Sequence, residues 1–325
     1  MKFFAAVSIA LSLAETNGFL QPHISHSYNF DQGSAFISKS RLFHGPPQYE
    51  KIDCVLREAE VVGNKSVMLH IDTEASIDYK PGHVMALEIE NVLTESSEKN
   101  NEDASNNGGW LRGPYTVSRS TENSFDILIK VVGDKSELFA SSEPGTKLKF
   151  GAKLKVPILE GIEKESTERV VFISTGVGVG PFVGAIEDAM KDSDFPPIEL
   201  YACYRTKDDI VYEEYLKEIA EKNPEKFLWK PIISSENGRI SSVDNAKTIC
   251  SSGNDSSLEN THFHLIGNGQ MVKEWKEGLS KAGIPEEKVT IEMYFNGKAE
   301  VDESAVKTIA ETISKNLSAV GAIVS

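Results

Sequence analysis

The sequence predicts two domains in series, an antiparallel β-barrel and then a Rossmann-like parallel α/β domain. Two observations predict this order. Residues 46–160 contain short β-branched segments separated by turn residues, without a long helical pattern, which is typical of a small antiparallel barrel. In residues 161–299, strand patterns alternate with helical patterns, which is typical of a parallel sheet covered by helices on both faces.

Composition and charge narrow the range of partners. The chain has 325 residues, enough for two domains with separate cores. Its formal net charge of -15 argues against nucleic acid or an anionic membrane as the main partner, because both would be repelled. Its three cysteines, Cys54, Cys203 and Cys250, are widely separated and form no C-x-x-C motif. The sequence therefore predicts neither a disulfide framework nor a metal site, and it favours a reducing compartment for the mature chain.

Residues 1–45 have the pattern of a targeting segment. Lys2 precedes an apolar run with the layout of a signal peptide, which is too short to anchor the chain in a bilayer. Residues 19–45 are rich in serine and histidine, with Asp31 as their one acidic residue, as in a transit peptide. Together the two parts resemble a plastid-targeting sequence. Secretion is the alternative, and it would make three sequons available for glycosylation, at Asn64, Asn254 and Asn316.

The barrel is predicted from five strand patterns. They lie at 51–62, 66–74, 83–90, 124–132 and 147–150, and turn residues separate them. Segment 91–109 is polar, acidic and free of aromatic residues, so we expect an exposed loop inserted in the barrel.

The α/β domain is predicted from four strands and three helices. The strand patterns lie at 170–174, 198–204, 227–234 and 262–267, and the helical patterns lie at 209–222, at 269–283 and in the segment that ends near Met190. The charged segment 159–167 contains few apolar residues and is suitable as the boundary between the domains.

Residues 300–325 are predicted to form a separate amphipathic helix. Its apolar residues recur at spacings of three and four, at Val306, Ile309, Ile313, Leu317 and Val320. Asp302 or Ser304 is the expected N-cap.

The segment STGVGVGPF, at 174–182, has the features of a phosphate-binding turn. Its glycines, Gly176, Gly178 and Gly180, permit close approach of the backbone to a diphosphate, and the helix that follows presents free N–H groups to it. Pro181 lies in the first helical turn, where no amide donor is needed. The glycine spacing is not that of the G-x-G-x-x-G dinucleotide fingerprint.

Five motifs in series make the chain resemble the ferredoxin:NADP+ reductase family between Tyr49 and Tyr294. They are YKPGHVMAL at 79–87, GPYTVSRS at 113–120, GDKSELFASSEPGTKLKF at 133–150, GVGVGPF at 176–182, and LIGNGQM at 265–271 with IEMYF at 291–295. Members of this family are flavoenzymes with an N-terminal FAD-binding barrel and a C-terminal nicotinamide-nucleotide domain. The resemblance implies FAD and NADPH, or NADH, as cofactors.

The resemblance implies that the barrel binds FAD through two of these motifs. Tyr115 corresponds to the tyrosine that packs on the isoalloxazine ring, and Thr116 corresponds to the hydroxyl residue near its N5 atom. The pyrophosphate-binding residues of the family correspond to Gly133, Lys135 and Ser136.

One departure concerns the phosphate contact from the first flavin motif. The family's arginine belongs at position 113, which is glycine here. We expect Arg112 or Arg119 to reach the phosphate instead, with Ser118 as a further FAD-binding residue.

On the nucleotide side, the resemblance implies binding by the glycine-rich turn and by polar residues that follow it. The implied set is Thr175, Gly176, Gly178, Gly180, Pro181, Arg205, Ser234, Gly267, Gln270 and Met271. Ser235 stands where the family has an arginine, which weakens the case for the 2′-phosphate of NADP unless Arg205 or Arg239 supplies the charge. Ile266 takes the position of a cysteine beside the nicotinamide.

The implied catalytic residues are Thr116, Glu292 and Tyr294. In the family the tyrosine stacks on the flavin and must move for the nicotinamide to enter. The glutamate takes part in proton and electron transfer. Plant-type members end at this tyrosine, whereas this chain continues. The tail is therefore expected to cover the nicotinamide site, to bind a partner or to pad the surface.

The expected function is hydride transfer between NAD(P)H and FAD, with electron exchange to ferredoxin or another acceptor. An acidic chain gives no general steering toward an acidic ferredoxin, so docking requires a local basic patch. The candidate patch is Lys147, Lys149, Lys153 and Lys155. Two alternatives remain: a reductase-fold binding or tethering protein with weak or no turnover, and an NADH-dependent reductase component of an oxygenase.

Overall fold

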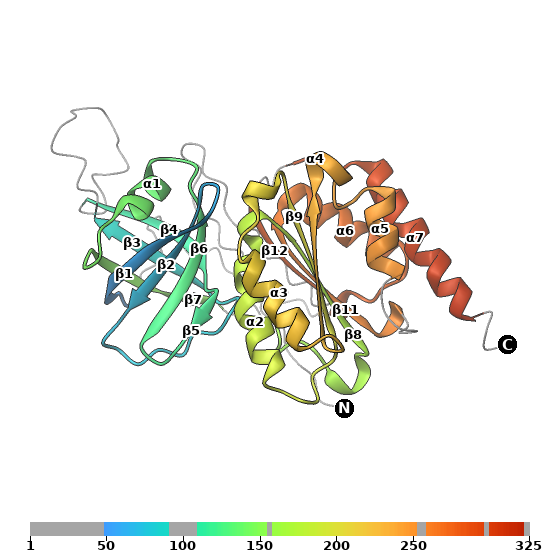
Figure 1. The fold of residues 1–325 in the computed structure, drawn as a ribbon, viewed down its shortest axis with the longest axis horizontal. Helices are drawn as coiled ribbons and strands as arrows, with labels where there is room; N and C mark the ends of the chain where they lie inside the picture. The colour runs from blue at the N-terminus through green and yellow to red at the C-terminus, as the bar shows by residue number, and fades with distance from the viewer. Residues whose placement is uncertain (1–48, 91–108, 155–157, 252–257, 296–298, 322–325) are drawn as a thin grey trace, which may run out of the picture.

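The computed structural model describes residues 49–90, 109–154, 158–251, 258–295 and 299–321. The predicted targeting segment, the loop up to residue 108, the sequon at Asn254 and Lys155 lie outside the described residues. The described chain forms two units side by side, a sheet-rich unit and an α/β unit, as Figure 1 shows.

The first unit is a barrel-like antiparallel sheet of seven strands in the order β4-β3-β7-β1-β2-β6-β5. The strands are β1 (Ile52–Gly63), β2 (Ser66–Asp72), β3 (Val84–Glu90), β4 (Trp110–Thr116), β5 (Arg119–Ser120), β6 (Ser124–Lys130) and β7 (Lys147–Leu154), and one helix, α1 (Asp134–Ser141), lies between β6 and β7. Apolar residues on alternate positions of the strands form the core, where Leu56, Leu87 and Phe150 are fully buried. The predicted antiparallel barrel is confirmed.

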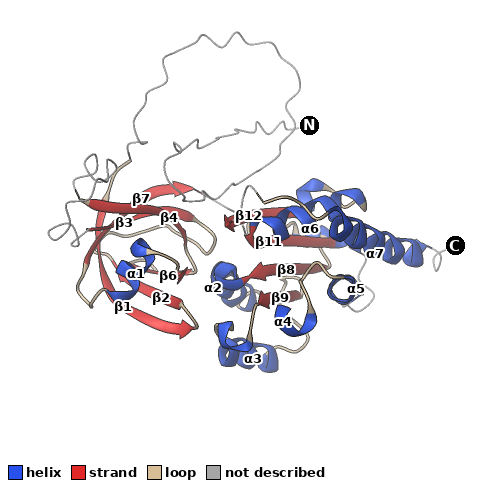
Figure 2. Ribbon diagram, turned by 90° about the horizontal axis from the view of Figure 1, so that it is seen from above, coloured by secondary structure: helices blue, strands red, loops and turns tan. Residues whose placement is uncertain are grey.

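The second unit is a parallel sheet of five strands in the order β10-β9-β8-β11-β12. The strands are β8 (Arg169–Thr175), β9 (Ile198–Tyr204), β10 (Phe227–Ile233), β11 (Thr261–Asn268) and β12 (Val289–Phe295). The helices are α2 (Gly180–Met190), α3 (Glu213–Lys222), α4 (Ser234–Asn237), α5 (Val243–Ser251), α6 (Gly269–Lys281) and α7 (Glu303–Gly321), and the 3-10 turns are Lys164–Ser166, Gly176–Val179, Lys207–Asp209, Leu258–Asn260 and Glu286–Lys288. Figure 2 shows helices on both faces of this sheet, as the alternating sequence pattern predicts.

The order of the parallel strands positions a ligand site. Chain order reverses between β8 and β11, which are neighbours in the sheet although β9 and β10 follow β8 in the sequence. In open α/β sheets such a reversal leaves a crevice at the carboxyl ends of the strands, where ligands bind. The turn that begins at Gly176 follows β8 at this point.

Several local elements differ from their sequence-based predictions. The helix predicted at 209–222 begins at Glu213, because Tyr212 has a left-handed backbone with φ of 60° and interrupts the helical pattern. The chain between β10 and β11, where the sequence predicts no helix, contains α4 and α5. Within the barrel, β4 and α1 form in segments where the sequence showed motifs rather than an element, and β4 pairs residue by residue with β3.

Helix α2 joins the two units. A Cβ atom on Gly184 would lie 2.1 Å from the carbonyl oxygen of Ser118, so only glycine permits this approach of α2 to the barrel. Beside it, Arg119 donates from Nε to the Glu187 carboxylate at 2.7 Å, and its guanidinium lies 5.1 Å from the ring centre of Tyr212. Both views place α2 on the barrel side of the α/β unit (Figures 1 and 2).

The C-terminal helix α7 packs on α6 and α5, at the end of the molecule away from the barrel (Figure 1). Val306, Ile309 and Ile313 are fully buried on its inner face, as the spacing of apolar residues predicts. Asp302 is the N-cap, because its carboxylate accepts from the backbone N–H groups of Ser304 and Ala305. None of the helices in the described ranges is long and apolar enough to cross a membrane.

Candidate functional site

The glycine-rich turn after β8 is held by close backbone contacts. Gly176 has φ of +53°, which favours glycine, and a Cβ on Gly178 would lie 2.7 Å from the carbonyl oxygen of Ile266 on β11. Gly267 has φ of +136°, and Thr175 Oγ1 accepts from the backbone N–H of Asn268 at 2.7 Å. These contacts fix the ends of β8 and β11 against each other at the point where strand order reverses.

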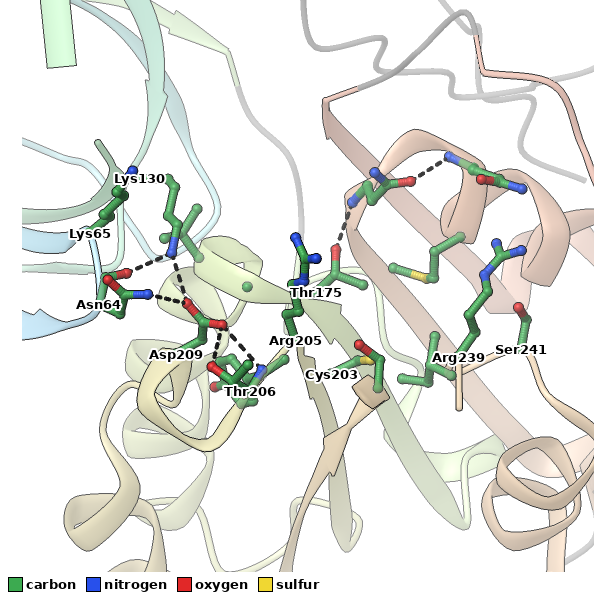
Figure 3. Close-up of a pocket in the computed structure, with 18 residues that line it drawn as sticks. Asn64, Lys65, Lys130, Thr175, Cys203, Arg205, Thr206, Asp209, Arg239 and Ser241 are labelled. Carbon is green, nitrogen blue, oxygen red and sulfur yellow. Dashed lines mark hydrogen bonds and ion pairs between the residues drawn. The ribbon is translucent and has the colours of Figure 1, made fainter. Parts of the chain in front are cut away.

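A pocket of about 770 Å³ opens at the carboxyl ends of β8, β9 and β10. Its lining includes Thr175, Gly176, Arg205, Ser234, Gln270 and Met271, which are predicted nucleotide-binding residues. Figure 3 shows Thr175 and Arg205 near the middle of the pocket and Arg239 and Ser241 at one end. The remaining predicted residues of this group lie outside the lining: Gly178 and Gly267 support the turn, and Gly180 and Pro181 are buried in α2.

The other end of the pocket is formed with the barrel. Lys130 on β6 and Asn64 after β1 both contact the carboxylate of Asp209, at 3.4 Å from Lys130 Nζ and 3.2 Å from Asn64 Nδ2. Figure 3 shows this cluster opposite Arg239 and Ser241. The sequence does not predict this cluster, because no motif links positions so far apart in the chain.

Three predicted catalytic residues meet between the two units. Thr116, the last residue of β4, donates from Oγ1 to Glu292 Oε1 at 2.6 Å, and Glu292 lies on β12 of the other unit. Tyr294 is two residues further along β12, with its hydroxyl buried. Ile266, opposite Glu292 in the β11–β12 pairing, is fully buried and forms part of the apolar wall behind this group.

Burial changes the acid strength of Glu292. The side chain is fully buried, and removal from water raises the pKa of its carboxyl group to about 8, although the hydrogen bond from Thr116 lowers it. Burial also raises the pKa of the Tyr294 hydroxyl well above its usual value, and the neighbouring Glu292 raises it further. Among the described residues, Glu292 Oε2 has no hydrogen-bond partner, so one oxygen of this buried carboxyl group is unpaired.

The predicted flavin face of β4 carries Tyr115 together with Lys135. A Cβ on Gly113 would lie 2.4 Å from Lys135 Nζ and 3.1 Å from the Tyr115 ring, so glycine at this position admits the lysine. Lys135 donates to the carbonyl oxygen of Arg112 at 3.0 Å, and burial lowers the pKa of its ammonium group. The ring of Tyr115 meets Phe139 of α1 edge to face, with centroids 5.4 Å apart.

Ser136 and Gly133 lie at the start of α1, next to Lys135. Ser136 Oγ accepts from the backbone N–H groups of Val132 and Gly133, at 2.9 and 3.1 Å, and donates to the Gly133 carbonyl. The hydroxyl therefore shapes the turn at the N-terminus of α1, and Lys135 is the cation that this turn presents beside Tyr115.

Arg112, Ser118 and Arg119 lie apart from that group. Side chains alternate along a strand, and Arg112 points to the face of β4 opposite Gly113, where its guanidinium stacks 4.5 Å from the ring centre of Tyr49. Ser118 is buried and its Oγ accepts from the backbone N–H of Leu128. Arg119 binds Glu187 of α2 as described above. In this structure neither arginine reaches the Tyr115 face, and Lys135 is the cation found there.

This chain is similar to one family model, to curated proteins and to solved structures. The family model is the oxidoreductase NAD-binding domain, and it matches residues 172–277. The electron transfer component of anthranilate 1,2-dioxygenase from Acinetobacter baylyi is 22% identical over 240 residues, which are 72% of this chain and 64% of that protein. The chain spans less than two thirds of the length of the curated relatives it matches.

Solved structures share the two-unit arrangement. A ferredoxin NADP+ reductase from Neisseria gonorrhoeae with bound FAD and NADP has a TM-score of 0.60 at 17% identity, with 77% of this chain and 100% of that chain covered. A flavohemoglobin from Malassezia yamatoensis with bound FAD and heme has a TM-score of 0.61 at 19% identity, with 75% and 60% covered. This chain thus carries an oxidoreductase NAD-binding domain within the two-domain fold of the ferredoxin-NADP+ reductase-like flavoprotein reductases.

Proposed function

We propose that this chain is a flavoprotein oxidoreductase that transfers a hydride between a nicotinamide nucleotide and FAD and exchanges electrons with a carrier. The observation that carries the proposal is the hydrogen bond from Thr116 to Glu292, which joins the barrel strand of the flavin motif to the last strand of the nucleotide unit. A hydride donor and acceptor must meet between two such units, and positioning them is the contribution of the protein.

The residues present fit both nucleotides. Tyr115 offers an aromatic face for a flat ring, and Lys135 and the turn at Gly133 suit a diphosphate. On the other unit, the turn at Gly176 and the pocket beside it suit a second diphosphate at the carboxyl ends of the strands. When bound, FAD supplies the chemistry that accepts a hydride and passes electrons on one at a time.

We assign Thr116, Glu292 and Tyr294 to the junction where the two nucleotides meet. Glu292, with its pKa of about 8, holds a proton at neutral pH and keeps Thr116 oriented through their hydrogen bond. Tyr294 shields the junction from water until the nicotinamide replaces its ring. The buried apolar wall that includes Ile266 excludes water from the same place.

The acceptor in this proposal is a redox carrier protein such as a ferredoxin. The lysines of β7 give only partial support for docking of such a carrier, because two of them already have partners within the chain. Lys147 is exposed, whereas Lys149 lies 4.5 Å from the ring centre of Trp110 and Lys153 binds the Asp78 carboxylate at 2.9 Å. Similarity to the electron transfer component of a dioxygenase supports a second candidate, a reductase that serves an oxygenase.

We also propose delivery to a plastid, on the basis of residues 1–45.

The test is the visible absorption spectrum of the purified chain before and after NADH or NADPH is added without oxygen. A flavin spectrum that bleaches supports hydride transfer. A colourless chain that cannot be reconstituted with FAD contradicts the proposal and favours a binding or tethering role. A fluorescent protein fused after residue 45 tests the location, since export to the medium would contradict plastid delivery.

A further inference from the structure

The start of the C-terminal helix lines a cavity beside the pocket of the nucleotide unit. A second cavity, of about 320 Å³, shares Arg239 and Ser241 with the first pocket and is also lined by Asp302, the N-cap of α7, and by Ser304 and Ala305 in the first turn of that helix. The tail that continues beyond Tyr294 is therefore more than padding, since its first residues form a wall beside the proposed nucleotide site.

Glu274 of α6 holds this corner together. The side chain is fully buried, and both of its oxygens accept from Arg239 Nη2 at 2.9 Å. The same carboxylate accepts from Ser241 Oγ at 2.8 Å, Gln270 Nε2 at 3.0 Å and the backbone N–H of Asp302 at 3.3 Å. These donors fix the position of the buried Glu274 carboxylate. The positive charge of Arg239 is paired with it and neutralises it.

Asp302 adds a second negative charge. Its Oδ2 lies 3.9 Å from Arg239 Nη1, and its side chain is 44% exposed. Hydrogen bonds from Ser304 lower the pKa of Asp302, so its carboxylate is ionised at neutral pH. Arg239 is thus one cation beside two carboxylates, Glu274 and Asp302. The partly exposed Asp302 carboxylate lines the second cavity.

The direction of a bound nucleotide follows from the two ends of the pocket. If its diphosphate meets the turn at Gly176 and its nicotinamide meets the junction at Glu292, its adenosine end extends along the carboxyl ends of β9 and β10. That path leads to Ser234 and Arg239. A ribose hydroxyl can donate to a carboxylate there, whereas a 2′-phosphate brings further negative charge.

We infer that Asp302, at the start of the C-terminal helix, makes this helix part of the nucleotide site and selects NADH over NADPH. The inference rests on the proposed function. Arg205, which lines the same pocket from the end of β9 and is exposed, is the rival determinant because it could pair with a 2′-phosphate.

The test compares the full chain with Asp302→Asn. Asparagine is as good an N-cap as aspartate, so this change removes the charge and keeps the helix start. The specificity ratio, kcat/KM for NADH over kcat/KM for NADPH, is expected to favour NADH in the natural chain. The variant is expected to lower that ratio by about tenfold at low ionic strength, because one unit charge near a doubly charged phosphate is removed. Arg239→Gln is avoided, since it would leave the buried Glu274 without its cation.

The matched control is Glu303→Gln, which removes an equal charge from the next residue. Glu303 is exposed, pairs with Lys281 at 3.2 Å and lines neither cavity, so its ratio should equal that of the natural chain. Calorimetric titration with AMP and with adenosine 2′,5′-bisphosphate gives a readout without turnover. Only Asp302→Asn should strengthen binding of the bisphosphate.

Two results would overturn the inference. A natural chain that prefers NADPH would assign the 2′-phosphate to Arg205, and an Asp302→Asn ratio equal to that of Glu303→Gln would show that the charge has no effect. In both cases either nucleotide still bleaches the flavin, so the reductase function stands. Failure of both nucleotides to bleach the flavin would instead remove the proposed function, and the inference with it.

Discussion

Thr116 and Glu292 are 176 residues apart in the chain, yet the hydroxyl of one donates to the carboxylate of the other at 2.6 Å. Thr116 ends a barrel strand and Glu292 lies in the last strand of the parallel sheet, so this bond exists only when both units are folded and docked. It reports directly on the geometry of the junction on which the proposed function depends.

Replacing Glu292 with glutamine should change how stability depends on pH. In the folded chain its pKa is about 8 against an ordinary value of 4.5, so between these values the folded state holds a proton that the unfolded state has released. The contribution of Glu292 to stability therefore falls as pH rises through this window. Glutamine does not titrate, and Glu292→Gln should gain stability relative to the natural chain between pH 5 and 8, on the order of a few kcal/mol.

Urea unfolding of the FAD-free chain at pH 5, 6.5 and 8 measures this difference. A constant difference between the two chains at all three pH values would show that Glu292 is not the titrating group.

Thr116→Val should slow flavin reduction by about 10- to 100-fold, because it removes the donor to a buried carboxylate and leaves the side-chain volume nearly unchanged. Thr116→Ser keeps the hydroxyl and should stay close to the natural rate. Stopped-flow bleaching of the flavin under anaerobic conditions measures both. Equal rates in the two variants would mean that the hydrogen bond does not contribute to hydride transfer.

Lys135→Gln should weaken FAD binding by about 10- to 100-fold, because the only cation on the Tyr115 face among the described residues is lost. The paired change Gly113→Arg with Lys135→Gln should recover much of the affinity, since the shorter polar side chain leaves room for an arginine at position 113. Gly113→Arg alone should bind FAD poorly, because its guanidinium would compete with the Lys135 ammonium group for the same space and repel it. Equilibrium dialysis with FAD measures these affinities.

Riboflavin provides the control for that experiment, because it lacks the diphosphate. Its affinity should not change in Lys135→Gln. An equal loss for riboflavin and FAD would indicate that Lys135 supports the fold around Tyr115 rather than the diphosphate.

Lys149→Glu with Lys153→Glu should lower ferredoxin-dependent turnover steeply at low salt and only slightly at high salt, if β7 is the docking surface. Lys307→Glu with Lys315→Glu makes the same charge change on α7, at the end away from the barrel, and serves as the control. Turnover as a function of salt concentration measures the effect. Identical behaviour of both double variants would exclude β7 as the docking site.

The sequence predicts elements whose periodicity is local. The apolar spacing of α7 and the glycine-rich turn after β8 required only neighbours in the chain, and both predictions agree with the structure. The start of α3 was misplaced because Tyr212 adopts a left-handed conformation within a segment whose spacing is helical. Periodicity does not record the backbone angle of a single residue.

The charged contacts were harder to predict, because they depend on which face of a strand a residue occupies. Arg112 and Gly113 are adjacent in sequence but point to opposite faces of β4, so the arginine meets Tyr49 and the space at Gly113 is filled by Lys135. The network around Glu274 joins α6, the segment at Arg239 and the start of α7, and no motif connects them.

The position of Tyr294 inside the chain has a kinetic consequence. Its strand β12 is paired with β11, and the described chain resumes at Ala299, whose carbonyl accepts from Lys273 of α6 at 3.0 Å. The ring is therefore carried by backbone that is held on both sides, unlike a ring at a free chain end. In the proposed function, exchange of this ring with a nicotinamide is therefore expected to proceed by rotation about its side-chain bonds, and the rate of exchange should depend on the side chains packed around the ring.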